Sequence, residues 1–338
     1  MKPTFKLALM LLAALALSGC QAPGDTFFVR SLEADMPVMV RGNTASKKLV
    51  LFLHGGPGGT AIPMAELTSF KALEERYAVA YWDQRGAGNA QGNAAAGSLT
   101  MAQHVADLDR IVDVLKRRYQ PDSLYLLGHS WGGTLATSYL LDPVRQAKIK
   151  AWVSSDGSFS MVEASRLSRE WALKRAQEKI DQGQDVAKWQ GIHTWYQQTP
   201  QLDASNYAQH YRHVSELGAY VYDPKQLEKP DVFGMLFFSP HAVTSELANF
   251  GYSTEHMIPE LLKLDLLPEM GAITLPTLVI NGRHDGMVPV GVAEAGFAAL
   301  GTPASDKTLT IFEKSAHRPL GEEPAAFAQA VRAFLDRY

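Results

Sequence analysis

The chain has 338 residues, of which 46% are hydrophobic and 20% are charged, an ordinary balance for one large globular domain or two small ones. Its formal net charge is −3, and its lysines and arginines form no basic stripe. A mildly acidic chain lacks the positive surface that binds a phosphate backbone, so we expect no nucleic-acid partner.

The N-terminus predicts an export signal. Lys2 and Lys6 precede the apolar segment "LALMLLAALAL", and small residues follow in "SGC". A positive start, a short apolar run and small residues at its end are typical of a secretory signal peptide. The run is also shorter than the roughly 20 apolar residues that a membrane-spanning helix needs.

The segment "LSGC", ending at Cys20, resembles the lipobox of bacterial lipoproteins. The resemblance implies a signal peptide over residues 1–19, lipidation of Cys20 and a protein anchored by lipid in the bacterial cell envelope. Cys20 is the only cysteine of the chain, so it has no partner for an internal disulfide. Gln21 stands where an aspartate would indicate retention in the inner membrane, so we expect the outer membrane.

Apolar strands and helices alternate along the rest of the chain. Stretches that carry predicted strands cover 26–31, 36–42, 47–56, 77–86, 122–130, 148–156, 275–285 and 307–317. Predicted helices cover 100–119, 134–142, 292–300 and 324–338. In the first of these helices Thr100 is a suitable N-cap, and apolar side chains recur at helical spacing.

The central strands are continuous apolar runs, which is typical of a mostly parallel sheet covered by helices on both faces. Residues 156–268 interrupt this pattern, because they are rich in tryptophan, tyrosine, glutamine and charged residues and contain no clear buried strand. We therefore expect an α/β core built from residues 20–155 and 269–338, with a helical cap over 156–268 inserted between its two parts.

The segment "GHSWGG" at residues 128–133 follows one of these strands directly and precedes a helix. It fits the pattern G-x-S-x-G, with Ser130 at the apex of a strand-to-helix turn. Small neighbours leave room for a strained turn that exposes the serine, and the N-terminus of the next helix favours developing negative charge. Ser130 is therefore the predicted nucleophile.

A serine needs a base beside it and an acid behind the base, in the chain order serine, acid, histidine. Asp285 follows an apolar strand in "NGRHDG", and His317 follows the last strand in "EKSAH". Both lie where strands end at the same edge as Ser130, and they are the predicted acid and base. Glu313 stays open as an alternative acid, whereas His284 is predicted to point away.

Two backbone N–H groups are predicted to bind the oxyanion, that of Trp131 and that of Gly56 in "HGGPGG". His129 is predicted to pack or to form hydrogen bonds locally. His210 and His213 in "HYRH" lack a third ligand at a useful spacing, so a solvated helix is favoured over a metal site there.

Together, "HGGPGG", "WDQRGAG" and "GHSWGG" resemble the proline iminopeptidase group (peptidase family S33) of the α/β-hydrolase superfamily. The resemblance spans the predicted mature chain. It implies an α/β-hydrolase fold with a helical cap, a triad of Ser130, Asp285 and His317, oxyanion donors at Gly56 and Trp131, and no cofactor or metal. Asp83 and Arg85 of "DQRG" are expected to form a buried supporting pair.

The predicted function is that of a serine hydrolase that forms an acyl-enzyme on a small molecule or short peptide, as an aminopeptidase. An ammonium group would need cap carboxylates, for which Glu163, Glu246 and Asp156 are the candidates. A carboxylesterase or lactonase is the alternative, and a non-catalytic binding protein is another. Large aromatic residues of the cap would suit an acyl or aromatic group; they are Trp171, Trp189, Trp195, Phe237 and Phe238.

Overall fold

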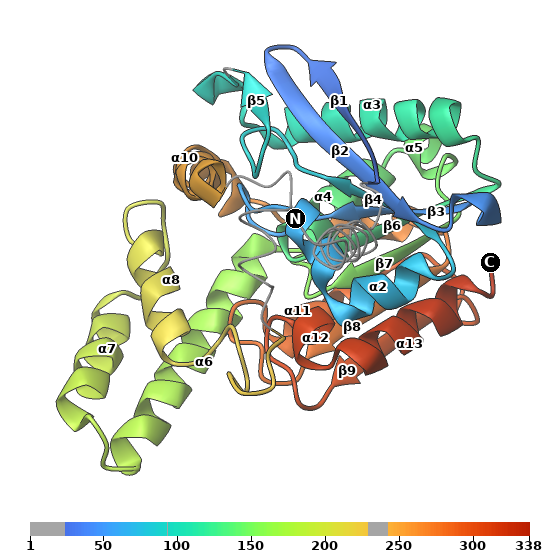
Figure 1. The fold of residues 1–338 in the computed structure, drawn as a ribbon. Helices are drawn as coiled ribbons and strands as arrows, with labels where there is room; N and C mark the ends of the chain where they lie inside the picture. The colour runs from blue at the N-terminus through green and yellow to red at the C-terminus, as the bar shows by residue number, and fades with distance from the viewer. Residues whose placement is uncertain (1–23, 93, 229–242) are drawn as a thin grey trace, which may run out of the picture.

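The computed structural model describes residues 24–92, 94–228 and 243–338 (Figure 1). The predicted signal peptide and Cys20 lie outside the described residues. Among the described residues, no helix combines the length and the apolar character that a membrane crossing requires.

The core is a mostly parallel sheet, as predicted, with the strand order β1-β2-β4-β3-β6-β7-β8-β9 and with β5 paired to β2. The strands are β1 (Asp25–Ser31), β2 (Ala34–Gly42), β3 (Lys48–Leu53), β4 (Ala78–Trp82), β5 (Gln91–Gly92), β6 (Ser123–His129), β7 (Ala151–Ser155), β8 (Thr277–Gly282) and β9 (Lys307–Phe312). β2 pairs in antiparallel fashion with β1, β4 and β5. The remaining pairs, which run from β4 through β3, β6, β7 and β8 to β9, are parallel.

Apolar side chains on both faces of the strands build two separate hydrophobic cores. On β3, Leu49, Leu51 and Leu53 belong to one core, whereas Val50 and Phe52 belong to the other. This division follows from the two-residue repeat of a strand, which sends successive side chains to opposite faces. A strand buried on both faces must therefore be apolar throughout, which is the pattern that the sequence shows.

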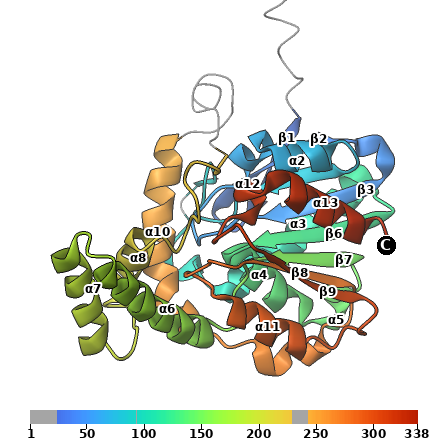
Figure 2. The same cartoon turned by 90° about the horizontal axis from the view of Figure 1, so that it is seen from below.

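Helices cover both faces (Figures 1 and 2). One face packs against α3 (Met101–Tyr119), α4 (Trp131–Leu140) and α11 (Val290–Ala299), and the other against α2 (Thr68–Glu74) and α13 (Pro324–Leu335). The short helices α5 (Pro143–Gln146) and α12 (Pro319–Glu322) complete the core. Thr100 caps α3, because its side chain accepts a hydrogen bond from the Gln103 N–H.

Among the described residues, four α-helices between β7 and β8 lie beyond the carboxyl ends of the parallel strands (Figures 1 and 2). These cap helices are α6 (Met161–Asp181), α7 (Val186–Gln198), α8 (Tyr207–Glu216) and α10 (Val243–Leu261). α6, α7 and α8 share a small hydrophobic core, which includes Ala172, Trp189 and Val214, whereas Met257 and Leu261 of α10 belong to a core of the sheet. The cap helices therefore cover the sheet edge at which sites form in folds of this class.

The expected solvated helix around His210 is wrong, because this side chain is buried in the cap. Its Nδ1 lies 2.8 Å from the Tyr196 hydroxyl and its Nε2 lies 3.2 Å from Ser168 Oγ. Ser168 in turn donates to the carbonyl of Gly286. Burial lowers the pKa of His210 to about 4, so it acts as a neutral link inside the cap.

Candidate active site

Ser130 lies in a strained turn between β6 and α4. Its φ of 53° and ψ of −121° are unusual for a residue with a side chain. The turn fits only because its neighbours are small: a Cβ on Gly128 would lie 2.5 Å from the Gly132 carbonyl oxygen, and one on Gly132 would lie 2.0 Å from that of Leu53. The glycines of the motif therefore let the chain present the Ser130 hydroxyl at the sheet edge.

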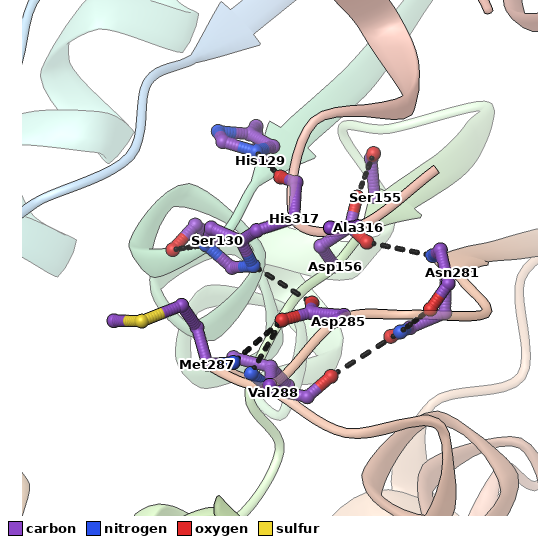
Figure 3. Close-up of polar contacts among 12 residues, drawn as sticks. His129, Ser130, Ser155, Asp156, Asn281, Asp285, Met287, Val288, Ala316 and His317 are labelled. Carbon is purple, nitrogen blue, oxygen red and sulfur yellow. Dashed lines mark hydrogen bonds and ion pairs between the residues drawn. The ribbon is translucent and has the colours of Figure 1, made fainter. Parts of the chain in front are cut away.

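The structure brings Ser130, His317 and Asp285 together, although they come from loops after three different strands (Figure 3). His317 Nε2 lies 2.9 Å from Ser130 Oγ, and His317 Nδ1 lies 2.7 Å from Asp285 Oδ2. The second carboxylate oxygen of Asp285 accepts the N–H groups of Met287 and Val288 at 2.8 and 2.9 Å. The acid is thereby held in one orientation behind the imidazole.

The alternative partners lie elsewhere. Glu313 is exposed and forms an ion pair with Arg283 at 2.7 Å. The ring of His284 stacks on that of Tyr222, with 4.2 Å between the ring centroids. Neither side chain takes part in the hydrogen bonds that join Asp285, His317 and Ser130, so Asp285 is the one of these candidates that contacts His317.

The surroundings of His317 have opposing effects on its pKa. Burial by itself would lower the pKa of His317, but the charge and the hydrogen bond of Asp285 outweigh burial and raise it. The bond to Asp285 also sets the tautomer, because Nδ1–H donates to the carboxylate and leaves Nε2 free to accept the serine proton.

A second buried carboxyl group, that of Asp156, lies beside the pair of Asp285 and His317. The three side chains each offer an atom within 4.8 Å of the others. Asp156 Oδ1 accepts the Gly282 N–H at 2.9 Å, and its Oδ2 lies 2.7 Å from Ser155 Oγ. Burial, followed by the charge of Asp285, raises the pKa of Asp156 to about 8, so this carboxyl is neutral at pH 7.

The sequence analysis predicted that His129 packs or forms hydrogen bonds locally, but this side chain contacts the distant loop that carries His317. Its Nε2–H donates to the backbone carbonyl of His317 at 2.9 Å, which joins the turn of the serine to the loop of the histidine. Burial lowers its pKa to about 3, so His129 stays neutral and holds this bond across the working pH range.

Of the two predicted oxyanion donors, Trp131 is the first residue of α4 and Gly56 lies in the loop after β3. Trp131 begins α4, so its backbone N–H is one of the first-turn groups that a helix leaves unpaired. Gly56 has a φ of 138°, and a Cβ there would lie 2.7 Å from the Gly58 nitrogen. The positive φ and this close approach require glycine at the loop.

The motifs, the strand order and this geometry agree with a comparison with protein families, in which residues 48–324 match the model described as the alpha/beta hydrolase fold. The chain belongs to the α/β-hydrolase fold family. Its sequence is also similar to that of a Bacillus subtilis protein named a probable aminopeptidase, with 28% identity over 87% of this chain and 91% of that protein. A proline iminopeptidase of Saccharolobus solfataricus is 26% identical over 86% of each chain.

Solved structures show the same fold at lower identity. A proline iminopeptidase from Mycobacterium smegmatis has a TM-score of 0.64 and 18% identity, covering 93% of this chain and 98% of that one. An esterase from Exiguobacterium antarcticum has a TM-score of 0.59 and 18% identity, covering 92% of this chain and 100% of that one. Both agree in fold with this α/β hydrolase.

A cavity of about 720 Å³ opens at Ser130 and His317 between the core and the cap helices. Its wall is mostly apolar, with a group of aromatic rings from the cap. These rings belong to Tyr207, Tyr211, Tyr220 and Phe250. Among the described residues that line the cavity, the charged side chains are Arg212, Glu255 and Arg318. The size and the lining suit a small organic substrate.

Most of the cap residues proposed from the sequence lie elsewhere. Glu163 forms an ion pair with Arg166 and does not line the cavity. The Asp156 carboxyl lies beside Asp285 and His317 and is absent from the cavity lining. The side chain of Glu246 is outside the described residues. Glu255, which the sequence analysis did not single out, is the carboxylate that α10 brings to the cavity.

The tryptophans that were predicted to line the substrate cavity do not line it in the structure. Trp189 belongs to the core of the cap, and Trp171 and Trp195 pack against that core, so none of the three lines the cavity. Phe237 and Phe238 lie outside the described residues. Helical spacing brings large side chains to one face of a helix but does not say whether that face meets another helix or a substrate.

The expected pair of Asp83 and Arg85 is wrong, because each has other partners. Arg85 forms two hydrogen bonds with Asp107 of α3, at 2.8 and 2.9 Å, and both side chains are fully buried. Asp83 accepts N–H groups of Ala61 and Asn89 at 2.7 and 2.8 Å. The reason is local geometry: Asp83 meets the backbone of the two loops, while Arg85 extends to the neighbouring helix.

Glu322 is a supporting residue that the sequence analysis missed. Its side chain is buried, with one oxygen accepting the Ala316 N–H at 2.9 Å and the other accepting the Tyr222 N–H at 2.6 Å. It thus connects the residue before His317 to the segment that follows α8. Glu322 ends the short helix α12, and its closeness in the chain to the histidine five residues before it was the available signal.

Proposed function

We propose that this α/β hydrolase is a serine hydrolase that acts through an acyl-enzyme. The supporting observation is the chain of hydrogen bonds from Asp285 through His317 to Ser130 Oγ, with separations of 2.7 and 2.9 Å. This arrangement turns a weakly nucleophilic hydroxyl into one that can lose its proton during attack.

In the proposed mechanism Ser130 attacks the substrate carbonyl while His317 Nε2 takes its proton. The N–H groups of Gly56 and Trp131 stabilise the oxyanion that forms. His317 then gives the proton to the leaving group, which leaves an acyl group on Ser130. Water, activated by the same imidazole, releases the acid and restores the serine.

We further propose that the substrate carries a free amine, as in a small peptide or an aminoacyl amide. Glu255 supports this proposal because an ammonium group in a mostly apolar cavity needs a carboxylate partner. The relatives named as aminopeptidases and proline iminopeptidases are consistent with it. The apolar cavity wall favours a second candidate, an esterase acting on small acyl groups.

A parallel assay separates these candidates. Wild type and the variants Ser130→Ala and Glu255→Gln would be tested on prolyl and other aminoacyl naphthylamides and on short nitrophenyl esters. An aminopeptidase should prefer the amides, and Glu255→Gln should lower kcat/KM for the amides but not for the esters. Preference for the esters in both wild type and Glu255→Gln would select the esterase.

A fluorophosphonate probe tests the nucleophile itself. Wild type should be labelled at Ser130, Ser130→Ala should not be labelled, and His317→Ala should react much more slowly because the hydroxyl has lost its base. Labelling that persists in Ser130→Ala would refute the assignment of the nucleophile.

We also propose that Cys20 carries a lipid anchor in the cell envelope, on the sequence signal alone. Cys20→Ala should release the protein from washed membranes into the soluble fraction. Equal membrane fractions for the two forms would contradict lipidation, and separation of inner and outer membranes would test the expected location.

A further inference from the structure

Arg318 is a half-buried cation in the substrate cavity that has no carboxylate partner among the described residues. Many other arginines of the chain form ion pairs; Arg283, for example, pairs with Glu313 at 2.7 Å. The guanidinium of Arg318 instead lies over the ring of Tyr220, with its carbon 5.7 Å from the ring centroid. A guanidinium stacked in this way keeps its N–H donors available for an anion.

Arg318 is close to the catalytic imidazole in space as well as in sequence. The Tyr220 ring that it covers also packs against the His317 ring, with 5.3 Å between the centroids. Burial lowers the pKa of His129, and the positive charge of Arg318 adds to this effect; the same charge opposes the rise in the pKa of His317 that Asp285 causes. Because Tyr220 contacts both side chains, the permanent positive charge of Arg318 lies close to His317.

The leaving group must occupy this side of the site. His317 gives its proton to the departing atom, so that atom lies next to Nε2 when the bond to the acyl carbon breaks. In a dipeptide the departing atom is the backbone nitrogen of the second residue, and the carboxylate carbon of that residue is two bonds away. A carboxylate at this point lies within reach of a guanidinium, which binds it with strong, geometrically specific hydrogen bonds.

We propose that Arg318 binds the carboxylate of the leaving group, so that the preferred substrates are dipeptides and other small molecules with a carboxylate next to the bond that is cleaved. This inference rests on the proposed acyl transfer at Ser130. It complements Glu255, because a dipeptide carries both an ammonium and a carboxylate group.

Matched substrates test the proposal. Prolyl-alanine is compared with its C-terminal amide, and O-acetyl-lactate, whose carboxylate carbon is also two bonds from the departing atom, with its amide. Each amide removes the carboxylate while keeping the bond that is cleaved. Wild type should prefer the acid of each pair. In Arg318→Gln the ratio of kcat/KM for acid to neutral substrate should fall about tenfold to a hundredfold, the range for a hydrogen bond between charged groups.

Variants separate charge from structure. Arg318→Lys should retain part of the ratio, and Arg283→Gln, a surface control, should leave it unchanged. A similar ratio in wild type and Arg318→Gln would overturn the proposal, as would a loss found in Arg212→Gln instead. The melting temperature of each variant shows whether the fold is preserved.

Calorimetry in the Ser130→Ala background gives a result that does not depend on turnover. Prolyl-alanine should bind more tightly than its amide, and adding Arg318→Gln should remove this difference. Equal affinities for the acid and the amide in Ser130→Ala would refute the carboxylate site. If wild type cleaves none of the four substrates, the proposed function fails, while the binding measurement still tests Arg318.

Discussion

Glu322 joins the backbone of Ala316, next to the catalytic histidine, to the backbone of Tyr222, which follows the cap helix α8. Its two oxygens accept the two N–H groups at 2.9 and 2.6 Å, and the side chain is buried. The Glu322 carboxyl group therefore binds both the loop that carries His317 and the segment that follows α8. A change at Glu322 should affect both the position of the base and the packing of the cap.

The first prediction is that Glu322→Gln lowers kcat. An amide oxygen can accept one of the two N–H groups, but the amide NH₂ cannot accept the other, so a buried donor loses its partner. A hydrogen bond to a charged group contributes about 1.5–3 kcal/mol, which predicts a loss of about tenfold or more if it holds His317 in place. The matched control is Glu323→Gln, because a single oxygen of Glu323 accepts from the Lys314 N–H and the Ser315 hydroxyl, and an amide oxygen can keep both bonds. Equal kcat values for wild type and Glu322→Gln would contradict this role.

The second prediction concerns the pH dependence of kcat/KM. His317 must be neutral to accept the serine proton, and Asp285 raises its pKa above the ordinary value of 6.5 against the opposing effect of burial. Activity should therefore fall as the pH drops through a midpoint above 6.5. Asp285→Asn removes the charge, so the midpoint should move to lower pH and the maximal rate should fall by about 10⁴, as in other serine triads. An unchanged midpoint in Asp285→Asn would contradict the prediction that Asp285 raises the pKa of His317.

The third prediction concerns stability and Asp156. Burial and the charge of Asp285 raise its pKa from 3.8 to about 8, so between these values the folded protein binds a proton that the unfolded chain does not. The free energy of unfolding should then decrease as the pH rises through this window, by up to about 1.4 kcal/mol per pH unit for one proton.

Asp156→Asn tests this, because an asparagine cannot titrate and tolerates the φ of 52° found at this position. Urea unfolding at pH 5 and pH 8 should show a smaller loss of stability in the variant than in wild type. Parallel pH dependence in the two proteins would mean that Asp156 is already ionised at low pH in the folded state.

The fourth prediction concerns the buried ion pair of Arg85 and Asp107, whose side chains are both 0% exposed. Asp107→Asn leaves the guanidinium buried without a counter-charge, which should lower the free energy of unfolding by about 3–5 kcal/mol. Asp113→Asn on the same helix is the control, because the Asp113 side chain is 48% exposed and its partner Lys148 also pairs with Asp109, so the loss should be small. Denaturant unfolding of the two variants measures the loss in free energy of unfolding. Equal losses would contradict the prediction that a buried guanidinium without its counter-charge is the more costly change.

The sequence determined the features that depend on near neighbours along the chain. Continuous apolar runs and helical periodicity predicted a mostly parallel sheet between helices, since the central strands are apolar on both faces. The glycines around Ser130 predicted a tight turn, since a Cβ there would meet backbone atoms. Asp285 and His317 were selected because they follow strands that end at the same edge as Ser130.

The tertiary structure decided which distant groups meet. Nothing near Arg85 in the chain indicates that Asp107 is its partner, since that pairing depends on how α3 packs against the sheet. The burial of His210, the turning of the cap tryptophans into their own core, and the presence of Glu255 and Arg318 in the cavity likewise depend on how the cap helices pack. Local patterns reflect backbone geometry that each residue carries with it, whereas these contacts depend on the path of the whole chain.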